Sequence, residues 1–363
     1  MAIDPADREA AAAAVDQVAA HTPLAEVRTR MEDRVELTTR PVTQLRLPGS
    51  CPLPSAVCRH KDHGRFGDHG VFHVRSVPAC DEDTAVEQAR RLGYPVVVKP
   101  GGRAGSAATL RADNDAEVRQ AYRQAGWETL FGLEDPGVVG VLIEECLAGS
   151  AIGAEIVVLD GGFHIVAVTR AQLGPEPHHL KTGYTVDARD PLLDAPEVTE
   201  AVDHAVRTLG IERGVLHVEL RLTAPGPALT EADASPDGDL VPLLVELATG
   251  IDLRAATAAL AVGTRPDLAP TRRRAAAVQF LYPAAAGRLG PVPPLTALRA
   301  RPWLERLVWT RRTGEQVTAP PHTSIADRLA HWVVTGDTTT ECRRHLADVL
   351  SQVADPVGRT TPH

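Results

Sequence analysis

Lysine is almost absent from this chain of 363 residues. Lysine and arginine together total 38, and only three of these residues, Lys61, Lys99 and Lys181, are lysines. A GC-rich genome is expected to drift toward arginine wherever either cation is adequate. The lysines that persist are then candidates for sites that need a compact ammonium charge and not a planar guanidinium. Chance persistence is the alternative explanation, so their surroundings have to decide.

Other absences exclude whole classes of protein. No segment approaches the roughly 18 consecutive apolar residues of a membrane span, and the N-terminus lacks the basic-then-apolar pattern of a signal peptide. The five cysteines are an odd number and form no Cys-x-x-Cys pair, which indicates reduced thiols in the cytoplasm and not a disulfide framework or a zinc site. A net charge of −9 argues against a nucleic-acid partner, because that binding depends on clustered positive charge.

The patterns that are present predict alternating helices and strands, and hence an α/β or α+β architecture. The chain is long enough for two or three packed subdomains. Helices are expected at residues 10–20, 81–93, 116–125, 197–209 and 341–353. Strands are expected at 94–99, 138–145, 155–159, 163–169, 215–221, 228–233, 275–282, 306–311 and 316–318, whereas 175–185 is expected to be irregular.

A glycine-rich loop follows the apolar strand that ends at Lys99. Glycines at positions 101, 102 and 105 precede Ser106. Such a loop exposes backbone N–H groups that suit phosphate oxygens, and Lys99 adds a positive charge beside them. The pattern is neither a Walker A loop nor a GxGxxG fingerprint. An ordinary glycine-rich strand-to-helix connection is the alternative.

The strands at 215–221 and 228–233 give a stronger signal. Period-two alternation places the apolar residues from Leu216 to Leu220 on one face of the first strand. His217, Glu219 and Arg221 then occupy the other face. In the second strand, Glu231 and Asp233 are expected to share a face with Leu229.

Residues 223–227 form a turn in this prediction, so the two strands make an antiparallel hairpin. If the hairpin is symmetric about Pro225, Glu219 lies opposite Glu231 and His217 lies opposite Asp233. Two carboxylates about 5 Å apart repel each other by roughly 3 kcal/mol at an effective dielectric near 20. A hard divalent cation between them reverses the sign. The pattern favours a metal site over a solvated hairpin with screened charges.

Together these segments resemble the ATP-grasp superfamily, and within it the carboxylate–amine ligases that make dipeptides and related amides. The resemblance covers roughly residues 47–355. Residues 47–62 are similar to the segment that precedes the grasp domain, and the order and spacing of all the motifs carry the similarity. It implies an α+β ATP-grasp fold in which two α/β subdomains grip ATP. The implied subdomains are a shortened pre-grasp segment (1–75), a lid (76–147), a metal and substrate subdomain (148–268) and a β-rich C-terminal subdomain (269–363).

The resemblance also implies roles for individual residues. Lys61 and Lys99 match the two lysines that contact the nucleotide phosphates. The loop of Gly101, Gly102, Gly105 and Ser106 matches the flexible phosphate loop. Glu144, Glu145 and Leu147 match the hinge that holds adenine. Glu219 and Glu231 fall where the family places its magnesium ligands, and Asp233 stands at the usual asparagine.

Three departures from the family pattern bear on activity. Ala151 stands where many relatives carry a glutamate that bonds the ribose hydroxyls. Ser235 replaces an arginine that often holds phosphate or the acyl substrate. Arg221, on the expected metal face, is a candidate substitute with a catalytic role. The segment before Leu47 is also shorter than the full pre-grasp domain.

The implied reaction uses ATP and Mg²⁺, with Mn²⁺ as an alternative metal, to join a small carboxylic acid to an amine such as an amino acid. Lys99 is the expected catalytic lysine. The second hypothesis is a non-catalytic nucleotide-binding relative, and a third is another ATP-grasp chemistry such as biotin-dependent carboxylation. Lys181, with His178 and His179, is either near the amine substrate or on the surface. The oligomeric state stays open, and a homodimer is compatible with the sequence.

Overall fold

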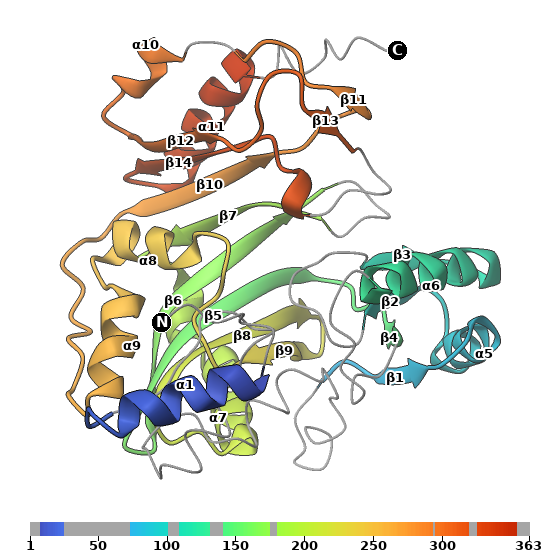
Figure 1. Ribbon diagram of the computed structural model, residues 1–363, viewed down its shortest axis with the longest axis horizontal. Coiled ribbons are helices and arrows are strands. Elements are labelled where there is room, and N and C mark those ends of the chain that lie inside the picture. Colours follow the sequence, from blue (N-terminus) through green and yellow to red (C-terminus); the bar gives the residue numbers. More distant parts are fainter. Residues whose placement is uncertain are drawn as a thin grey trace.

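The computed structural model describes residues 8–24, 73–100, 109–130, 141–174, 180–292, 295–318 and 325–353. Two main sheets organise these residues, one of four strands and one of eight, and a third sheet has two strands. Helices pack on both main sheets, which gives the mixed α+β architecture expected from the sequence (Figure 1).

The smaller main sheet falls within the predicted lid subdomain and comprises β1 to β4, with two helices packed on it. Its strands lie in the order β1-β4-β2-β3. Their bounds are β1 Ser76–Ala79, β2 Val96–Pro100, β3 Leu110–Ala112 and β4 Val141–Glu145. Helices α5 (Glu82–Leu92) and α6 (Asp115–Leu130) bury alanine and valine side chains against this sheet.

The bounds of α5 follow from local chemistry. Asp81 is the N-cap, and its carboxylate accepts a hydrogen bond from the Thr84 amide at 2.7 Å. Gly93 ends the helix with a positive φ of 92°, a conformation that glycine adopts without steric penalty. The sequence therefore predicted both ends of this helix correctly.

The eight-stranded sheet has the order β12-β14-β10-β7-β6-β5-β8-β9, and its neighbouring strands are antiparallel. Its strands are β5 Ser150–Leu159, β6 Gly162–Leu173, β7 Lys181–Asp187, β8 Gly214–Thr223, β9 Gly226–Asp233, β10 Ala275–Leu281, β12 Leu304–Trp309 and β14 Ala330–Gly336. The expectation of an irregular segment at 175–185 was wrong from residue 181 onward, because β7 pairs on both of its edges with β6 and β10.

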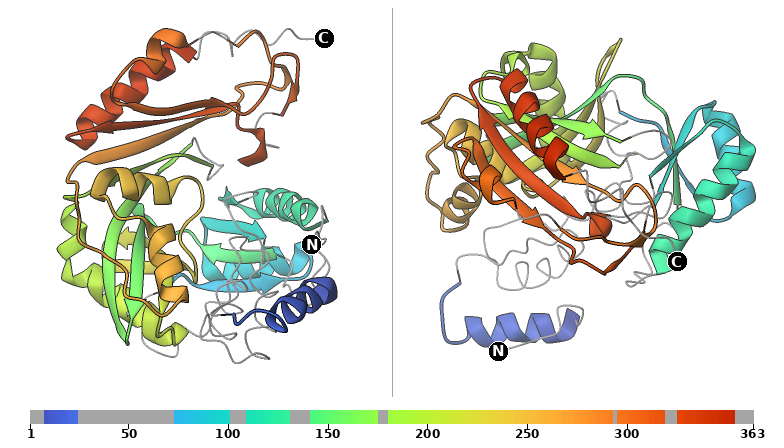
Figure 2. Two further views of the ribbon diagram at one scale, coloured as in Figure 1. Left: turned by 60° about the vertical axis from the view of Figure 1, so that its left-hand side comes forward. Right: turned by 90° about the horizontal axis from the view of Figure 1, so that it is seen from above.

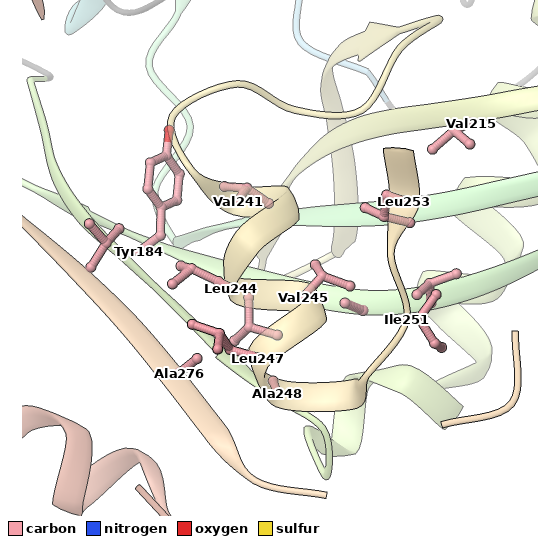
Figure 3. Packing of buried hydrophobic residues seen from close by; sticks show 14 of the residues in the cluster. Tyr184, Val215, Val241, Leu244, Val245, Leu247, Ala248, Ile251, Leu253 and Ala276 are labelled. Atoms are coloured by element: carbon pink, nitrogen blue, oxygen red, sulfur yellow. The ribbon is translucent and has the colours of Figure 1, made fainter. Parts of the chain in front are cut away.

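Helices cover both faces of this sheet. α7 (Pro196–Leu209) packs on one face against apolar side chains of β5, β8 and β9. On the other face, α8 (Val241–Thr249) and α9 (Leu253–Ala261) bury a second apolar cluster, in which Leu244, Val245 and Ala248 of α8 lie close to Tyr184 and Ala276 (Figure 3). Gly250 and Asp252 cap the facing ends of α8 and α9. α11 (Thr339–Val353) lies across β10 and β14 (Figure 2).

The larger sheet continues across the predicted boundary at residue 268, because β10 pairs with β7 on one side and with β14 on the other. The remaining elements are short or peripheral. They are α1 Arg8–Ala19, η2 Pro191–Asp194, β11 Gly287–Arg288, α10 Thr296–Arg299, β13 Gln316–Val317 and η3 Ile325–Asp327. Among the described residues, no helix combines the length and apolar character needed to cross a bilayer. The division into four subdomains stays a prediction.

Candidate active site

The predicted hairpin is formed by β8 and β9 at one edge of the large sheet. Glu219 pairs with Glu231, and His217 pairs with Asp233, so the expected register is confirmed. The turn and the pairing that produce this register differ from the prediction. Thr223 pairs with Gly226, which makes the turn two residues long, and a bulge between the Glu219 and Leu220 pairs restores the register.

The bulge also corrects one expectation about the faces of β9. Leu229 pairs with Leu220 and is fully buried in the apolar cluster under α7, together with Ala232. It therefore lies on the face opposite Glu231 and Asp233, not on the same face as predicted. The extra residue of the bulge, Thr230, changes the alternation because two residues of β9 span the place of one on β8.

The carboxylates of Glu219 and Glu231 thus face each other from neighbouring strands, on the sheet face opposite α7. Glu231 and Asp233 are half-buried, and both make further interactions. Directly opposed carboxylates are unfavourable in a sheet unless a cation lies between them. Oxygen donors of this kind are the ligands that Mg²⁺ prefers, so the residues fit a magnesium ion.

Lys181 of β7 donates a hydrogen bond to Glu219 Oε1. Its side chain is largely buried, so the interpretation of Lys181 as a surface residue was wrong. Burial by itself would lower the pKa of the Lys181 ammonium, but the Glu219 carboxylate raises this pKa well above its ordinary value. Burial would raise the pKa of Glu219, yet Lys181 and His217 hold it well below its usual range. Both groups are therefore charged at neutral pH.

Behind Glu219 lies a buried network that centres on His217. Its Nδ1 is 2.6 Å from Oε1 of the fully buried Glu155, and its Nε2 is 3.7 Å from Glu219 Oε1. Asp237 joins the network from the loop between β9 and α8, with its Oδ2 3.8 Å from His217 Nε2. The ring of His217 fits against Gly153, where an added Cβ would lie 2.4 Å from His217 Cε1.

Charge and burial shift the pKa values of His217 and Asp237 in this network. Burial would lower the pKa of His217, but the carboxylates of Asp237 and Glu155 raise it well above its ordinary value. Burial raises the pKa of Asp237 to about 6, and the nearby Glu155 and Glu219 carboxylates also raise it. The positive charges of His217 and Lys181 lower this pKa but do not cancel the increase. Sequence reasoning missed both Glu155 and Asp237 as site residues.

In the lid subdomain, Lys99 and Glu144 form a buried ion pair. Lys99 Nζ lies 2.8 Å from Glu144 Oε1, and both side chains are at most 10% exposed. They come from the adjacent strands β2 and β4, in which Val97 pairs with Glu144. The predicted phosphate lysine and one predicted adenine-binding glutamate are thus in contact with each other.

The segment that joins the lid to the large sheet is tied at two points. The Glu145 carboxylate accepts hydrogen bonds from the Arg75 amide at 2.8 Å and from Arg75 Nε at 2.9 Å. Arg221 Nη1 donates to the Gly149 carbonyl at 3.1 Å. Leu147 lies between these two anchors. The adenine contacts of Glu145 and Leu147 and the catalytic role of Arg221 stay predictions.

Several predicted site residues lie outside the described part of the chain. They are Lys61, Gly101, Gly102, Gly105, Ser106, His178 and His179.

The loop between β9 and α8 is fixed by the C-terminal part of the chain. Arg328, which precedes β14, forms two hydrogen bonds with the Asp239 carboxylate, one of them at 2.6 Å from Nη2. Its guanidinium also stacks 3.6 Å from the Phe280 ring centroid and donates to the Tyr282 hydroxyl at 2.7 Å. Asp239 itself has a positive φ of 51°. Asp237 is thereby held in place by a contact that no local motif indicates.

Two segments of the chain match known protein families. Residues 92–240 match the ATP-grasp domain family, and residues 279–354 match L-amino acid ligase C-terminal domain 2. The crystal structure of an L-amino acid ligase from Bacillus licheniformis superimposes with a TM-score of 0.79 and 21% identity, covering 96% of this chain and 84% of that one.

Two curated relatives are similar over about two thirds of this chain. The uncharacterized protein y4rH of Sinorhizobium fredii is 26% identical over 245 residues, which is 65% of this chain and 48% of that protein. Carnosine synthase 1 of Gallus gallus is 25% identical over 259 residues, which is 66% of this chain and 27% of that protein. The chain therefore spans about half of the first relative and about a quarter of the second.

Proposed function

Because the chain belongs to the ATP-grasp superfamily, we propose that it is a ligase that uses ATP and Mg²⁺ to join a carboxylic acid to an amine. The single observation that carries the proposal is the pairing of Glu219 with Glu231 across β8 and β9. Opposed carboxylates beside the ammonium of Lys181 form a charged site that suits a nucleotide phosphate chain with its cation.

The reaction has two steps. A substrate carboxylate attacks the γ-phosphoryl group of ATP, with release of ADP, and an amine then displaces phosphate from the acyl phosphate. Bound Mg²⁺ would neutralise charge on the phosphates from ligands supplied by Glu219, Glu231 and Asp233. Lys61, Lys99 and the loop of Gly101, Gly102, Gly105 and Ser106 would orient the phosphates through N–H groups and ammonium charge.

Other residues of the chain would bind the rest of the substrates. We assign adenine binding to Glu144, Glu145 and Leu147 in the segment that leads from the lid to the large sheet. Arg221, whose guanidinium holds the Gly149 carbonyl, would supply the cation that Ser235 does not provide for the substrate carboxylate. The lid would exclude water, which otherwise hydrolyses the acyl phosphate.

The substrate class follows from the relatives. The names of an L-amino acid ligase and of carnosine synthase support amino acids or similar small molecules as the acid and the amine. No nucleic acid or membrane takes part in this reaction. We place it in the cytoplasm, on the odd number of cysteines in the sequence and their spacing.

A screen of ADP release tests the proposal. Pairs of amino acids and small carboxylic acids are incubated with ATP, Mg²⁺ and the full chain, and products are identified by mass spectrometry. We expect one acid–amine pair to stimulate ADP formation and to yield an amide. Glu231→Gln should lower that rate at least about a hundredfold. The matched control Glu200→Gln, on the exposed surface of α7, should leave it unchanged.

Ser235 and Ala151 favour the second candidate function, a nucleotide-binding relative without catalysis. The same screen separates the two. Binding of ATP without stimulated ADP release across a broad panel would support the second function and contradict the ligase. A single turnover to an amide product would exclude it.

A further inference from the structure

The imidazole of His217 presents one nitrogen that no described residue satisfies. His217 is 3% exposed, and its Nδ1 lies 2.6 Å from the Glu155 carboxylate. A carboxylate only accepts hydrogen bonds, so Nδ1 carries a proton, and Nε2 offers a lone pair to a metal ion that displaces the second proton of the ring. Nε2 is buried and has no hydrogen-bond partner within the described ranges.

Two carboxylate oxygens converge on this nitrogen. Asp237 Oδ1 accepts from the Gly238 amide at 2.7 Å, whereas its Oδ2 is buried without a hydrogen bond to any described residue. Asp237 Oδ2 is 3.8 Å and Glu219 Oε1 is 3.7 Å from His217 Nε2. These separations are too long for N–H···O hydrogen bonds, which span about 2.7–3.2 Å. Hydrogen bonding at Nε2 therefore does not account for the approach of these two carboxylates.

The formal charges of the cluster leave an excess of negative charge that a divalent cation would neutralise. The carboxylates of Glu155, Glu219 and Asp237 surround His217, and among the described residues of this cluster Lys181 contributes one ammonium. Lys181 leaves two of the three negative charges in a largely buried volume, where uncompensated charge is costly. The second proton of the His217 ring neutralises one of them, whereas a divalent cation that displaces this proton neutralises both.

The separations of the donor atoms distinguish a metal ion from an ammonium group. Ligand atoms about 2.1 Å from a tetrahedral metal are about 3.4 Å apart. Acceptors about 2.9 Å from a tetrahedral ammonium nitrogen are about 4.7 Å apart. The distances from His217 Nε2 to Glu219 Oε1 and Asp237 Oδ2, 3.7 Å and 3.8 Å, lie closer to the separation expected around a metal ion. The two carboxylate oxygens would have to move toward Nε2 by a few tenths of an ångström to reach that separation.

We propose that His217 Nε2, Asp237 Oδ2 and the Glu219 carboxylate bind a divalent transition-metal cation, with Glu155 orienting the imidazole. The site is distinct from the magnesium position between Glu219 and Glu231, although Glu219 contributes to both. An imidazole ligand suits Mn²⁺ or Zn²⁺ better than Mg²⁺, which prefers oxygen. In such a carboxylate–histidine–metal arrangement, the Glu155 carboxylate fixes the tautomer of His217 and makes its Nε2 a stronger ligand for the metal.

Binding of Mn²⁺ to the full chain without nucleotide tests the site independently of ligase activity. The chelator-treated protein is titrated with Mn²⁺ and followed by electron paramagnetic resonance. Pulsed measurements detect the nitrogen of a coordinated imidazole. We expect one tightly bound ion with nitrogen coupling in the wild type. Asp237→Asn, which preserves shape, should weaken binding at least about tenfold, and Glu155→Gln about 10–100-fold.

His217→Gln provides the specificity control, because it retains every other histidine of the chain. This variant should lose both the nitrogen coupling and the tight binding, while Glu231→Gln should retain the coupling. Circular dichroism and thermal unfolding check that each variant is folded. Three results would overturn the site: no nitrogen coupling in the wild type, coupling that persists in His217→Gln, or wild-type affinity in folded Asp237→Asn.

Discussion

Arg328 and Asp239 form a bidentate ion pair between the C-terminal part of the chain and the loop that carries Asp237. Both side chains are largely buried, at 11% and 23% exposed. Burial would lower the pKa of the Arg328 guanidinium, but Asp239 raises it above its ordinary value, so Arg328 stays charged. The loop is therefore held by a largely buried ion pair between segments that are distant in the chain.

Replacement of Arg328 tests this anchor. Arg328→Met leaves the Asp239 carboxylate buried without its cation, and the free energy of unfolding should fall by about 3–5 kcal/mol. The ligase rate should fall as well, since the loop loses its position. Urea unfolding measures the first effect and ADP release the second. Arg254→Met, which removes an exposed pair with Glu246, should cost less than about 1 kcal/mol. Equal losses in the two variants would contradict the anchor.

The Lys99–Glu144 pair makes a second prediction, because stability and nucleotide binding can be separated there. Lys99→Met should lower stability by about 3 kcal/mol by stripping a buried carboxylate of its ammonium. It should also weaken ATP binding at least about tenfold. The double variant Lys99→Met/Glu144→Gln removes both charges and should recover most of the stability.

Calorimetric ATP titrations of the double variant supply the decisive comparison. Restored stability with weak ATP binding would assign Lys99 to the phosphates. Restored ATP affinity in the double variant would instead show that Lys99 acts only by neutralising Glu144.

The glycine in the segment between β4 and β5 gives a third prediction. Gly149 has φ of 134°, and an added Cβ would lie 1.9 Å from the Leu222 carbonyl oxygen. Gly149→Ala should therefore destabilise the protein by more than about 3 kcal/mol. Gly161→Ala is the matched control, since Gly161 also has positive φ but open space around it, and should cost only about 1–2 kcal/mol. Thermal unfolding compares them, and similar losses would contradict the close contact.

Tyrosine ionisation gives a prediction about pH. The chain has four tyrosines, and burial raises the pKa of each of them. Burial and the hydrogen bond to Asp115 raise the pKa of Tyr94 to about 12. In the unfolded chain the tyrosine hydroxyl groups have a pKa of about 10. Their contribution to stability is thus fully present below about pH 10 and is lost as the pH rises toward the folded values.

Ultraviolet absorbance of the phenolate checks this sign. At about pH 10 the native protein should show little phenolate, whereas the protein in concentrated urea should be about half ionised. Urea unfolding should also show stability decreasing above that pH. Half-ionised tyrosines in the native protein would contradict the burial of these side chains.

The hairpin shows what the sequence could predict. Alternation along 215–221 determined the faces of β8, and the pairing of Glu219 with Glu231 followed from assumed symmetry about Pro225. The register was correct because a shorter turn and the bulge at Thr230 offset each other. In a sequence that alternates with period two, a bulge is visible only as one residue that seems to lie on the wrong face of the strand. In β9 that residue is Leu229.

The remaining site residues depend on contacts between distant segments. Lys181 of β7 reaches Glu219 of β8 although β6 and β5 lie between these strands in the sheet, and Glu155 meets His217 because β5 lies beside β8. Asp237 takes its place through the pairing of Asp239 with Arg328, which is 89 residues away in the chain. Local propensity carries no information on such encounters. The scarcity of lysine was the one signal that pointed to Lys181.

The shared sheet limits how the chain can be divided. β10 pairs with Gly183–Asp187 along one edge of β7, the strand that carries Lys181. A chain shortened at residue 268 would leave that edge as a bare row of amide and carbonyl groups, open to pairing with other molecules. The C-terminal portion thus completes the sheet that carries Glu219 and Glu231, and a C-terminal portion exchanged between relatives would have to supply a strand that pairs with this edge of β7.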